Sequence, residues 1–199
     1  MDFLSTVEDM PNDIIVYDIE TQESFQQVGS RDPKKLHISV LGAYSYNERE
    51  FFSYTEEQLP QFWKRIEQCQ MVVGFNNHSF DDQVLSTYFP EMAKVQSFDM
   101  LAEVQRALGF RLRLDNLAQA SLGAAKSGDG LHAIALFAEG RIEELTSYCL
   151  DDVKITHELY EFGKNNGFVR YSDLKGLRQV AVDFNPPMDS LSAINLSLF

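Results

Sequence analysis

Cysteine is scarce in this sequence of 199 residues, in which Cys69 and Cys149 are the only two. They form no CxxC pair, and a disulfide framework or a thiolate zinc site needs more cysteines than this. A disulfide-stapled secreted domain is therefore not expected. We predict that both thiols are reduced residues of the core.

Long hydrophobic runs are also missing, since no stretch approaches the roughly 18 uninterrupted apolar residues that suggest a membrane-spanning helix. The N-terminal stretch MDFLSTVEDM is acidic, whereas a signal peptide combines a basic region with an apolar one. We therefore expect a cytoplasmic protein with no membrane partner.

Apolar residues nevertheless make up 44% of the chain, which supports a globular protein with a well-buried core. We predict a main domain over residues 1–170 and a C-terminal extension over residues 171–199. The extension is expected to hold an edge strand followed by a loose tail, because its end has two prolines and little charge.

Positive charge is in deficit, with 17 Lys and Arg against 30 Asp and Glu and a net charge of −13. Because phosphate contacts are made by Lys and Arg, this balance argues against tight, non-specific duplex binding. It does not exclude an enzyme acting on a strand end, since bound divalent cations would offset clustered acids locally. One stretch leans basic and is either a solvated face or a phosphate contact; it contains Arg106, Arg111, Arg113 and Lys126.

The order of the predicted elements indicates an α/β fold. Three strands over residues 13–19, 36–46 and 49–55 form an antiparallel meander, in which the turn at Asn47 and Glu48 joins the second to the third. The later elements are a helix over 56–69, a buried strand over 71–75, a short helix over 80–88, a parallel strand over 95–98, a helix from Asp99 to Gly109, a Gly-rich turn over 126–130, a long helix from Arg141 to Gly163, and possible edge strands over 167–171 and 179–184. We therefore predict a mixed sheet with helices on both faces.

The stretch IIVYDIETQ ends an apolar strand with two carboxylates, Asp18 and Glu20. Successive strand residues alternate between faces, so these two side chains emerge on the same face and repel each other. A divalent cation is the compact counter-charge that suits oxygen ligands. An Asp-x-Glu pair is expected about once by chance in so acidic a chain, so a solvated strand end is the alternative for this motif taken alone.

A second motif, Asn76-x-x-x-Phe80-Asp81, follows the predicted strand over 71–75. About 0.05 such matches are expected by chance, which makes this motif more informative than the first. The simpler alternative for Asp81 is a helix N-cap, with Asp82 as its exposed neighbour.

A third pair, Tyr148 and Asp152, lies in the long predicted helix. Residues four apart share one helix face, so Asp152 and not Asp151 points the same way as Tyr148. The alternative for Tyr148 is a core aromatic with a satisfied hydroxyl.

The three motifs, in this order, resemble the exonuclease motifs of the DEDD superfamily, tyrosine subtype, whose fold is ribonuclease-H-like. The resemblance covers about residues 13–163. The spacing of the motifs is similar to that in the proofreading exonuclease domains of family B polymerases and in helicase-associated exonuclease domains. The histidine subtype would have His five residues before the last Asp, where this sequence has Ser147. The tyrosine subtype is therefore the better assignment.

The resemblance implies a two-metal-ion 3′–5′ exonuclease acting on the 3′ end of single-stranded DNA or RNA and releasing nucleoside 5′-monophosphates. The implied ligands of two Mg²⁺ or Mn²⁺ ions are Asp18, Glu20, Asp81 and Asp152, while Tyr148 orients the attacking water. Our candidates for substrate binding are Thr21, Asn76, Phe80 and Lys126. A helicase or a polymerase is a candidate protein partner.

Two other functions stay open from the sequence. One is a catalytically silent module of the same fold that binds nucleic acid or protein, and the other is a phosphodiesterase acting on small molecules or short oligoribonucleotides. Asp99 is expected to cap a helix, and the histidines are expected to be structural. Three aromatic residues either pack in the core or stack on bases in a single-strand groove; they are Phe75, Phe80 and Phe110.

Overall fold

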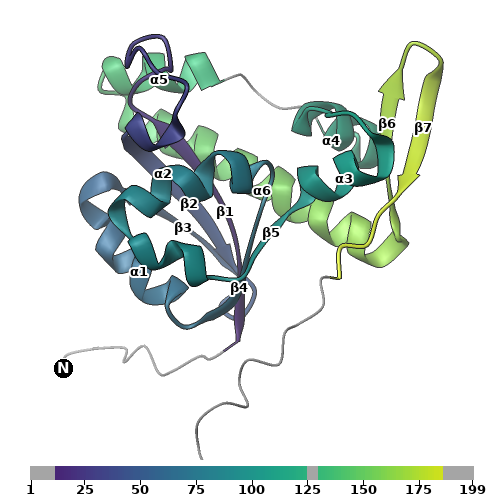
Figure 1. Cartoon of the computed structure of the whole chain (residues 1–199), viewed down its shortest axis with the longest axis horizontal. Coiled ribbons are helices and arrows are strands. Elements are labelled where there is room, and N and C mark those ends of the chain that lie inside the picture. The colour runs from purple at the N-terminus through teal and green to yellow at the C-terminus, as the bar shows by residue number, and fades with distance from the viewer. Residues whose placement is uncertain (1–11, 125–129, 186–199) are drawn as a thin grey trace, which may run out of the picture.

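The computed structural model describes residues 12–124 and 130–185 (Figure 1). Its centre is a five-stranded sheet in the order β3-β2-β1-β4-β5. The strands are β1 (Asp13–Thr21), β2 (Ile38–Ser45), β3 (Glu50–Thr55), β4 (Cys69–Gly74) and β5 (Ser97–Asp99). The first three form an antiparallel meander, and β4 and β5 continue parallel to β1. The predicted mixed α/β sheet is confirmed.

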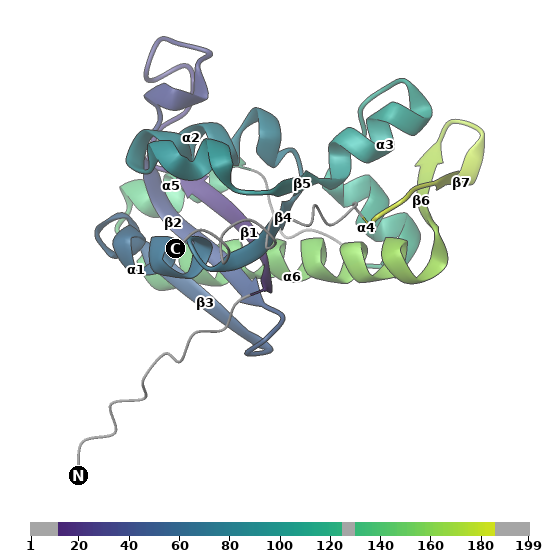
Figure 2. The same ribbon diagram turned by 60° about the horizontal axis from the view of Figure 1, so that its bottom comes forward.

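Helices cover both faces of this sheet, as Figures 1 and 2 show from two directions. One face packs against α1 (Leu59–Ile66) and α2 (Asp81–Tyr88), and the other against α6 (Ile142–Asn166). The remaining α-helices are α3 (Met100–Leu108), α4 (Leu114–Leu122) and α5 (Gly130–Ala138), and the 3₁₀ turns are η1 (Pro33–Lys35), η2 (Glu56–Gln58), η3 (Asn77–Ser79) and η4 (Pro90–Lys94). None of the described helices is long and apolar enough to cross a membrane.

Strand β1 divides the core because its side chains alternate between the two faces. Ile15, Tyr17 and Ile19 lie in the core under α1 and α2, whereas Val16 lies in the core under α6. Asp18 and Glu20 follow Val16 at intervals of two and therefore face α6. The alternation predicted from the sequence thus places both carboxylates on one side.

The pairing of β1 with β4 ends before β1 itself ends. Its last partners are Val16 and Val73, while the pairing with β2 continues to Thr21 and Ile38. Beyond Val16 the edge of β1 that faces β4 has no ladder partner. An opening of this kind at the carboxyl ends of parallel strands is a common place for ligands to bind in α/β sheets.

The helix predicted over 56–69 is shorter than expected. Its first turn is the 3₁₀ segment η2, and the α-helix begins only at Leu59 because Pro60 has no N–H to donate to Glu56. A Thr55-x-x-Gln58 capping box precedes it, with Thr55 N donating to Gln58 Oε1 at 3.0 Å. Cys69 was assigned to this helix wrongly, since it pairs with Asp13 at the start of β4.

The strands predicted as sheet edges at 167–171 and 179–184 do not join the main sheet. They form β6 (Phe168–Asp173) and β7 (Gly176–Ala181), which pair only with each other in a hairpin at the end of the molecule remote from α1 (Figures 1 and 2). The boundary predicted at residue 170 falls inside β6, and the two-part division stays a prediction. The Gly-rich turn at 126–129 and the tail from residue 186 lie outside the described residues.

The outer edge of β6 is closed by side chains of α4. Ser121 Oγ accepts from Arg170 N at 2.8 Å and donates to Arg170 O at 3.2 Å. Asn116 repeats the pattern with Ser172, with both bonds at 2.9 Å. These bonds satisfy backbone groups that a neighbouring strand would otherwise pair.

Ser121→Ala is expected to lower the free energy of unfolding by about 1–2 kcal/mol, because two backbone groups of Arg170 lose their partner in a partly buried place. Asn116→Ala should cost less, since its bonds to Ser172 are exposed and water replaces them. Both changes place Ala in α4, so helix propensity affects them alike. Urea denaturation of both variants measures the difference, and an equal or larger loss for Asn116→Ala would contradict this account.

Candidate active site

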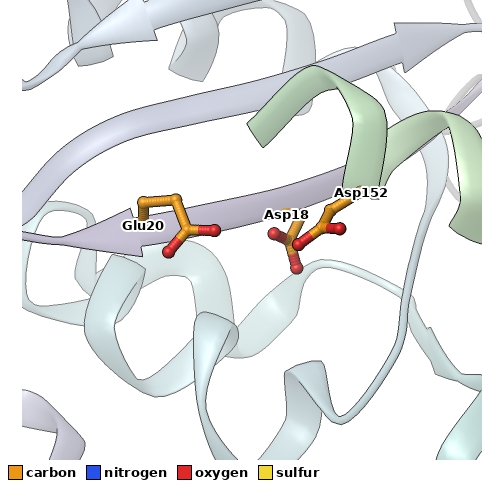
Figure 3. Close-up of side chains that lie close together, drawn as sticks. All are labelled: Asp18, Glu20 and Asp152. Carbon is orange, nitrogen blue, oxygen red and sulfur yellow. The ribbon is translucent and has the colours of Figure 1, made fainter. Parts of the chain in front are cut away.

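Three of the predicted carboxylates meet between β1 and α6. Asp18, Glu20 and Asp152 each offer an oxygen, and these oxygens lie within 4.8 Å of one another. Figure 3 shows the carboxylates of Asp18 and Asp152 turned toward each other, with Glu20 two residues further along β1. Glu20 and Asp152 are buried and Asp18 is half-buried. Residues more than a hundred positions apart in the sequence thus form one acidic cluster, which holds three of the four predicted carboxylates.

Gly42 explains how α6 lies close enough to the sheet for this meeting. It is the partner of Asp18 in β2, so the two residues are directly opposite each other. A Cβ atom at Gly42 would lie 2.9 Å from Val153 Cγ2 and 3.0 Å from Cys149 Sγ, both on α6. The Cys149 thiol also lies 3.6 Å from the carbonyl oxygen of Asp18, to which it donates. A residue without a side chain therefore sets the spacing between helix and strand at the acidic cluster.

Asp81 lies beside the acidic cluster but is not one of the three residues whose oxygens converge. Its Oδ1 accepts a hydrogen bond of 3.2 Å from Ile19 N, on the edge of β1 that β4 leaves unpaired. Asp81 is the first residue of α2, and the N-cap position is occupied by Phe80. The helix N-cap alternative is therefore wrong, and Asp81 instead closes the open edge of β1 between Asp18 and Glu20.

The electrostatic field of the acidic cluster reaches its neighbours. Burial, and next the charge of Asp18, raise the pKa of Asp81 well above its ordinary value. Burial, and then the charges of Asp18, Glu20 and Asp152, likewise raise the pKa of the Cys149 thiol. Negative charge thus accumulates at this place, and a bound cation would relieve the repulsion.

The loop that carries the second motif is held by Asp99. This residue caps α3 as predicted, with Oδ1 accepting from Leu101 N at 2.9 Å. The same carboxylate also accepts from Asn76 N at 2.8 Å and from His78 N at 3.3 Å. Asn76 has a left-handed backbone, with φ of 71°, a conformation that Asn tolerates better than most residues. Asp99 therefore positions the loop that leads into Asp81.

Asp82 was predicted to be exposed, and this prediction is wrong. Its carboxylate is half-buried and accepts hydrogen bonds from the Tyr17 hydroxyl and from Ser97 Oγ, the latter at 2.8 Å. Burial, and then the charge of Asp82, raise the pKa of Tyr17 well above its ordinary value. Asp82 thus anchors the first turn of α2 to β1 and β5, which fixes the direction of the neighbouring Asp81.

Tyr148 lies one turn before Asp152 on α6, as predicted from the spacing. Its ring is buried in a small core with Val40 and Leu136, and it stands edge-on to His132 at a centroid distance of 5.8 Å. The core position foreseen as an alternative is therefore correct for the ring. The role of its hydroxyl in orienting water stays a prediction.

A cavity of about 340 Å³ opens beside Glu20. Its walls include Thr21 and Phe80, two of the predicted substrate-binding residues, together with Phe25 and Leu131. The rings of Phe25 and Phe80 meet edge to face at 6.0 Å. Phe25 and Leu131 were missed because each is a single apolar residue with no motif around it. Their exposure on the surface is what distinguishes them.

The other two substrate-binding candidates lie elsewhere. Asn76 does not line this cavity, and its side-chain oxygen accepts a hydrogen bond from Arg111 Nη2 on the side of α3 and α4. Lys126 lies outside the described residues. The cavity beside Glu20 thus brings together two of the four candidates.

The donor set of the acidic cluster fits a divalent cation. Its ligand atoms are all carboxylate oxygens, the hard donors that Mg²⁺, Mn²⁺ and Ca²⁺ prefer, and buried like charges at this spacing need a counter-charge. Asp81 adds a further buried carboxylate at the edge of the cluster. The residues present therefore suit the kind of ion that the sequence implied.

Comparison with known proteins gives the family. A solved structure of a family B DNA polymerase from the hyperthermophilic archaeon Pyrobaculum calidifontis has a similar fold, with a TM-score of 0.59 and 16% identity over 77% of this chain and 24% of that chain. This chain thus spans about a quarter of the polymerase, and at such identity the likeness concerns the fold alone. Comparison with curated proteins found no significant match. The family model described as the RNase_H superfamily matches residues 15–162, well over half of the sequence, and the chain belongs to this family.

Proposed function

We propose that this chain is a metal-dependent 3′–5′ exonuclease of the tyrosine subtype that hydrolyses the terminal phosphodiester of single-stranded DNA or RNA. The observation that carries the proposal is the meeting of Asp18, Glu20 and Asp152 on β1 and α6, with Asp81 against the same strand. Membership of the RNase_H superfamily and the polymerase-like fold support a nucleic-acid substrate. The products would be nucleoside 5′-monophosphates.

The four acids are the residues that would hold two Mg²⁺ or Mn²⁺ ions. When bound, such ions lower the pKa of a coordinated water and stabilise the charge that develops on the leaving oxygen. Asp18 and Glu20 are held in place by a strand and Asp152 by a helix, and rigid elements position catalytic groups better than loops do. The Asp81 carboxylate is fixed at one oxygen by Ile19 N, and its other oxygen would be the one to contact an ion.

Two further features would serve the substrate. The Tyr148 hydroxyl can donate a hydrogen bond and would orient the attacking water, since it shares the face of α6 that carries Asp152. Phe25 and Phe80 give the cavity beside Glu20 an aromatic wall that would hold the terminal base by stacking. This arrangement would place the last phosphodiester next to the acidic cluster.

The test is an assay with single-stranded oligonucleotides labelled at the 5′ or the 3′ end, in the presence of Mn²⁺. Stepwise shortening from the 3′ end is expected, together with mononucleotide products. Asp81→Asn should reduce the rate at least about tenfold. This variant keeps an oxygen that accepts from Ile19 N, so it removes the charge without removing the structural bond.

The outcomes of this assay separate the competing functions. No shortening of either label would favour the silent binding module, and shortening from the 5′ end would refute the proposed polarity. Activity confined to substrates of two or three nucleotides would favour an enzyme that trims short oligoribonucleotides. Full activity in Asp81→Asn would refute the role proposed for this carboxylate.

A further inference from the structure

A second cavity, of about 450 Å³, lies away from the acidic cluster, where the loop 109–113 and α4 meet the hairpin. We call it the arginine groove. All of its lining residues except Leu112 have polar side chains, and they include Arg111, Arg113, Asn116, Gln119 and Ser172. One acid, Asp115, also lines it. Nothing in the proposed chemistry of the acidic cluster uses these residues.

The two segments that meet at the arginine groove carry net positive charge. The segments 109–122 and 168–181 together hold five Arg and Lys and two Asp, a net charge of +3 in a chain of net charge −13. Arg111 and Arg113 both line the groove and both are exposed. Among the described residues, Arg113 has no ion-pair partner that would neutralise it. Within residues 12–124 and 130–185, the groove is therefore one place on this acidic protein that suits an anionic ligand.

The walls of the arginine groove are fixed in position. Asn116 binds both backbone groups of Ser172 at 2.9 Å, which ties α4 to β6 across the groove. Phe110, directly before Arg111, is 47% exposed, and its ring stands edge-on to Tyr171 of β6 at 6.2 Å. Phe110 is not one of the lining residues of the groove, but its exposed ring adjoins Arg111 in the sequence. An exposed ring and two arginines are the elements of a single-strand binding surface, in which bases stack and phosphates meet positive charge.

The arginine groove is also connected to the acidic cluster. Arg111 donates a hydrogen bond to the side-chain oxygen of Asn76. Asn76 begins the loop that Asp99 holds and that ends at Asp81, the carboxylate bound to β1. The loop 76–81 thus links the arginine groove to the acidic cluster, and a strand bound at both places would run past it.

We propose that the arginine groove binds the backbone of a single-stranded nucleic acid upstream of the 3′ end, with Arg113 contacting a phosphate and Phe110 stacking on a base. This inference rests on the proposed exonuclease function and extends it, because it assigns a separate binding site for the part of the substrate that is not cleaved. The groove would retain the strand between successive cleavages. Its contribution should grow with substrate length.

Binding is measured by fluorescence anisotropy with a single-stranded oligonucleotide of about twelve nucleotides, in Asp18→Asn protein so that no cleavage occurs. Arg113→Gln is expected to weaken binding about fivefold to tenfold at low salt. The logarithm of the association constant falls linearly with the logarithm of the salt concentration. Arg113→Gln should make this slope shallower by about 0.7, the value for one lost phosphate contact on a single strand. Arg113→Lys should keep most of the slope, because it keeps the charge.

Lys64→Gln is the matched control. Lys64 is exposed on α1, at the end of the molecule remote from the hairpin, and its replacement removes the same charge. It should leave affinity and slope close to those of the parent. Phe110→Ala should weaken binding about tenfold without changing the slope, since stacking is not an ionic contact.

The results distinguish a failure of this inference from a failure of the proposed function. Equal affinities and slopes for Arg113→Gln and Lys64→Gln would overturn the arginine groove, even if the parent shortens 3′ ends normally. The groove would also be overturned if polyglutamate displaced the labelled oligonucleotide as effectively as unlabelled oligonucleotide does. Negative charge alone would then be enough for binding. Weakened binding of Arg113→Gln in a chain that cleaves nothing would support the groove and refute the exonuclease. In an active chain, Arg113→Gln should impair the long substrate at least about fivefold more than a dinucleotide.

Discussion

Replacing Asp152 with asparagine is expected to reduce nuclease activity at least about a thousandfold while making the metal-free protein more stable. The loss follows from removing one of three carboxylates that converge within 4.8 Å, and it corresponds to about 4 kcal/mol of transition-state stabilisation. The gain follows from relieved repulsion between buried like charges, for which about 1 kcal/mol is a reasonable magnitude. A purely structural carboxylate would lose stability on the same change, so the two effects together identify a cation site.

Asp151→Asn is the matched control, because Asp151 precedes Asp152 in α6 and is exposed. It should change neither activity nor stability appreciably. Thermal unfolding with and without Mn²⁺ provides a readout that does not depend on activity. Saturating metal should stabilise the parent by about 2.7 kcal/mol at a hundred times Kd, and should stabilise Asp152→Asn much less. Equal stabilisation of the two proteins, or more than a tenth of the activity remaining in Asp152→Asn, would contradict the assignment.

The sequence was sufficient for the parts of the fold and of the acidic cluster that depend on local periodicity. The period of two in β1 places Asp18 and Glu20 on one face, and the spacing of four in α6 places Tyr148 and Asp152 on one face. Both statements hold in any fold that keeps these elements. The order of strands and helices then indicated which layers meet, and the structure confirms it.

The sequence was insufficient where a residue's role depends on a distant partner. Asp82 was predicted to be an exposed neighbour of Asp81, because nothing local indicates that the Tyr17 hydroxyl, 65 positions away, bonds to it. The two C-terminal strands have ordinary strand composition, and nothing local indicates that they pair with each other while α4 covers the outer edge of β6. Phe25 contributes to a cavity wall only because β1 and α5 bring Glu20 and Leu131 beside it.

The role of Gly42 also depends on distant partners, the side chains of α6. Gly42→Ala is expected to lower the free energy of unfolding by about 2–3 kcal/mol and the activity by about a hundredfold. In most strands this change would be neutral or favourable, since alanine reduces the entropy of the unfolded chain. Here the new methyl would lie 2.9 Å from Val153 Cγ2, and a β-branched side chain in a helix has little rotamer freedom to move away. Helix α6 must shift, and Asp152, one residue before Val153, shifts with it.

A double-mutant cycle with Val153→Ala tests this explanation, because it removes the nearest of the α6 atoms that the new methyl would meet, while Cys149 Sγ at 3.0 Å remains and limits the recovery. Val153→Ala alone should lower stability by leaving a cavity beside β2, yet it should keep most of the activity. In the combined variant the two changes should partly compensate. Chemical denaturation should give a favourable interaction energy of about 1–2 kcal/mol, and the cleavage rate should be about tenfold higher than that of Gly42→Ala alone. If the two losses simply add, or if Gly42→Ala is fully active, then the approach of α6 to β2 does not set the position of Asp152. Compensation in stability without recovery of rate would show that close packing supports the fold and that the acidic cluster tolerates a displaced helix.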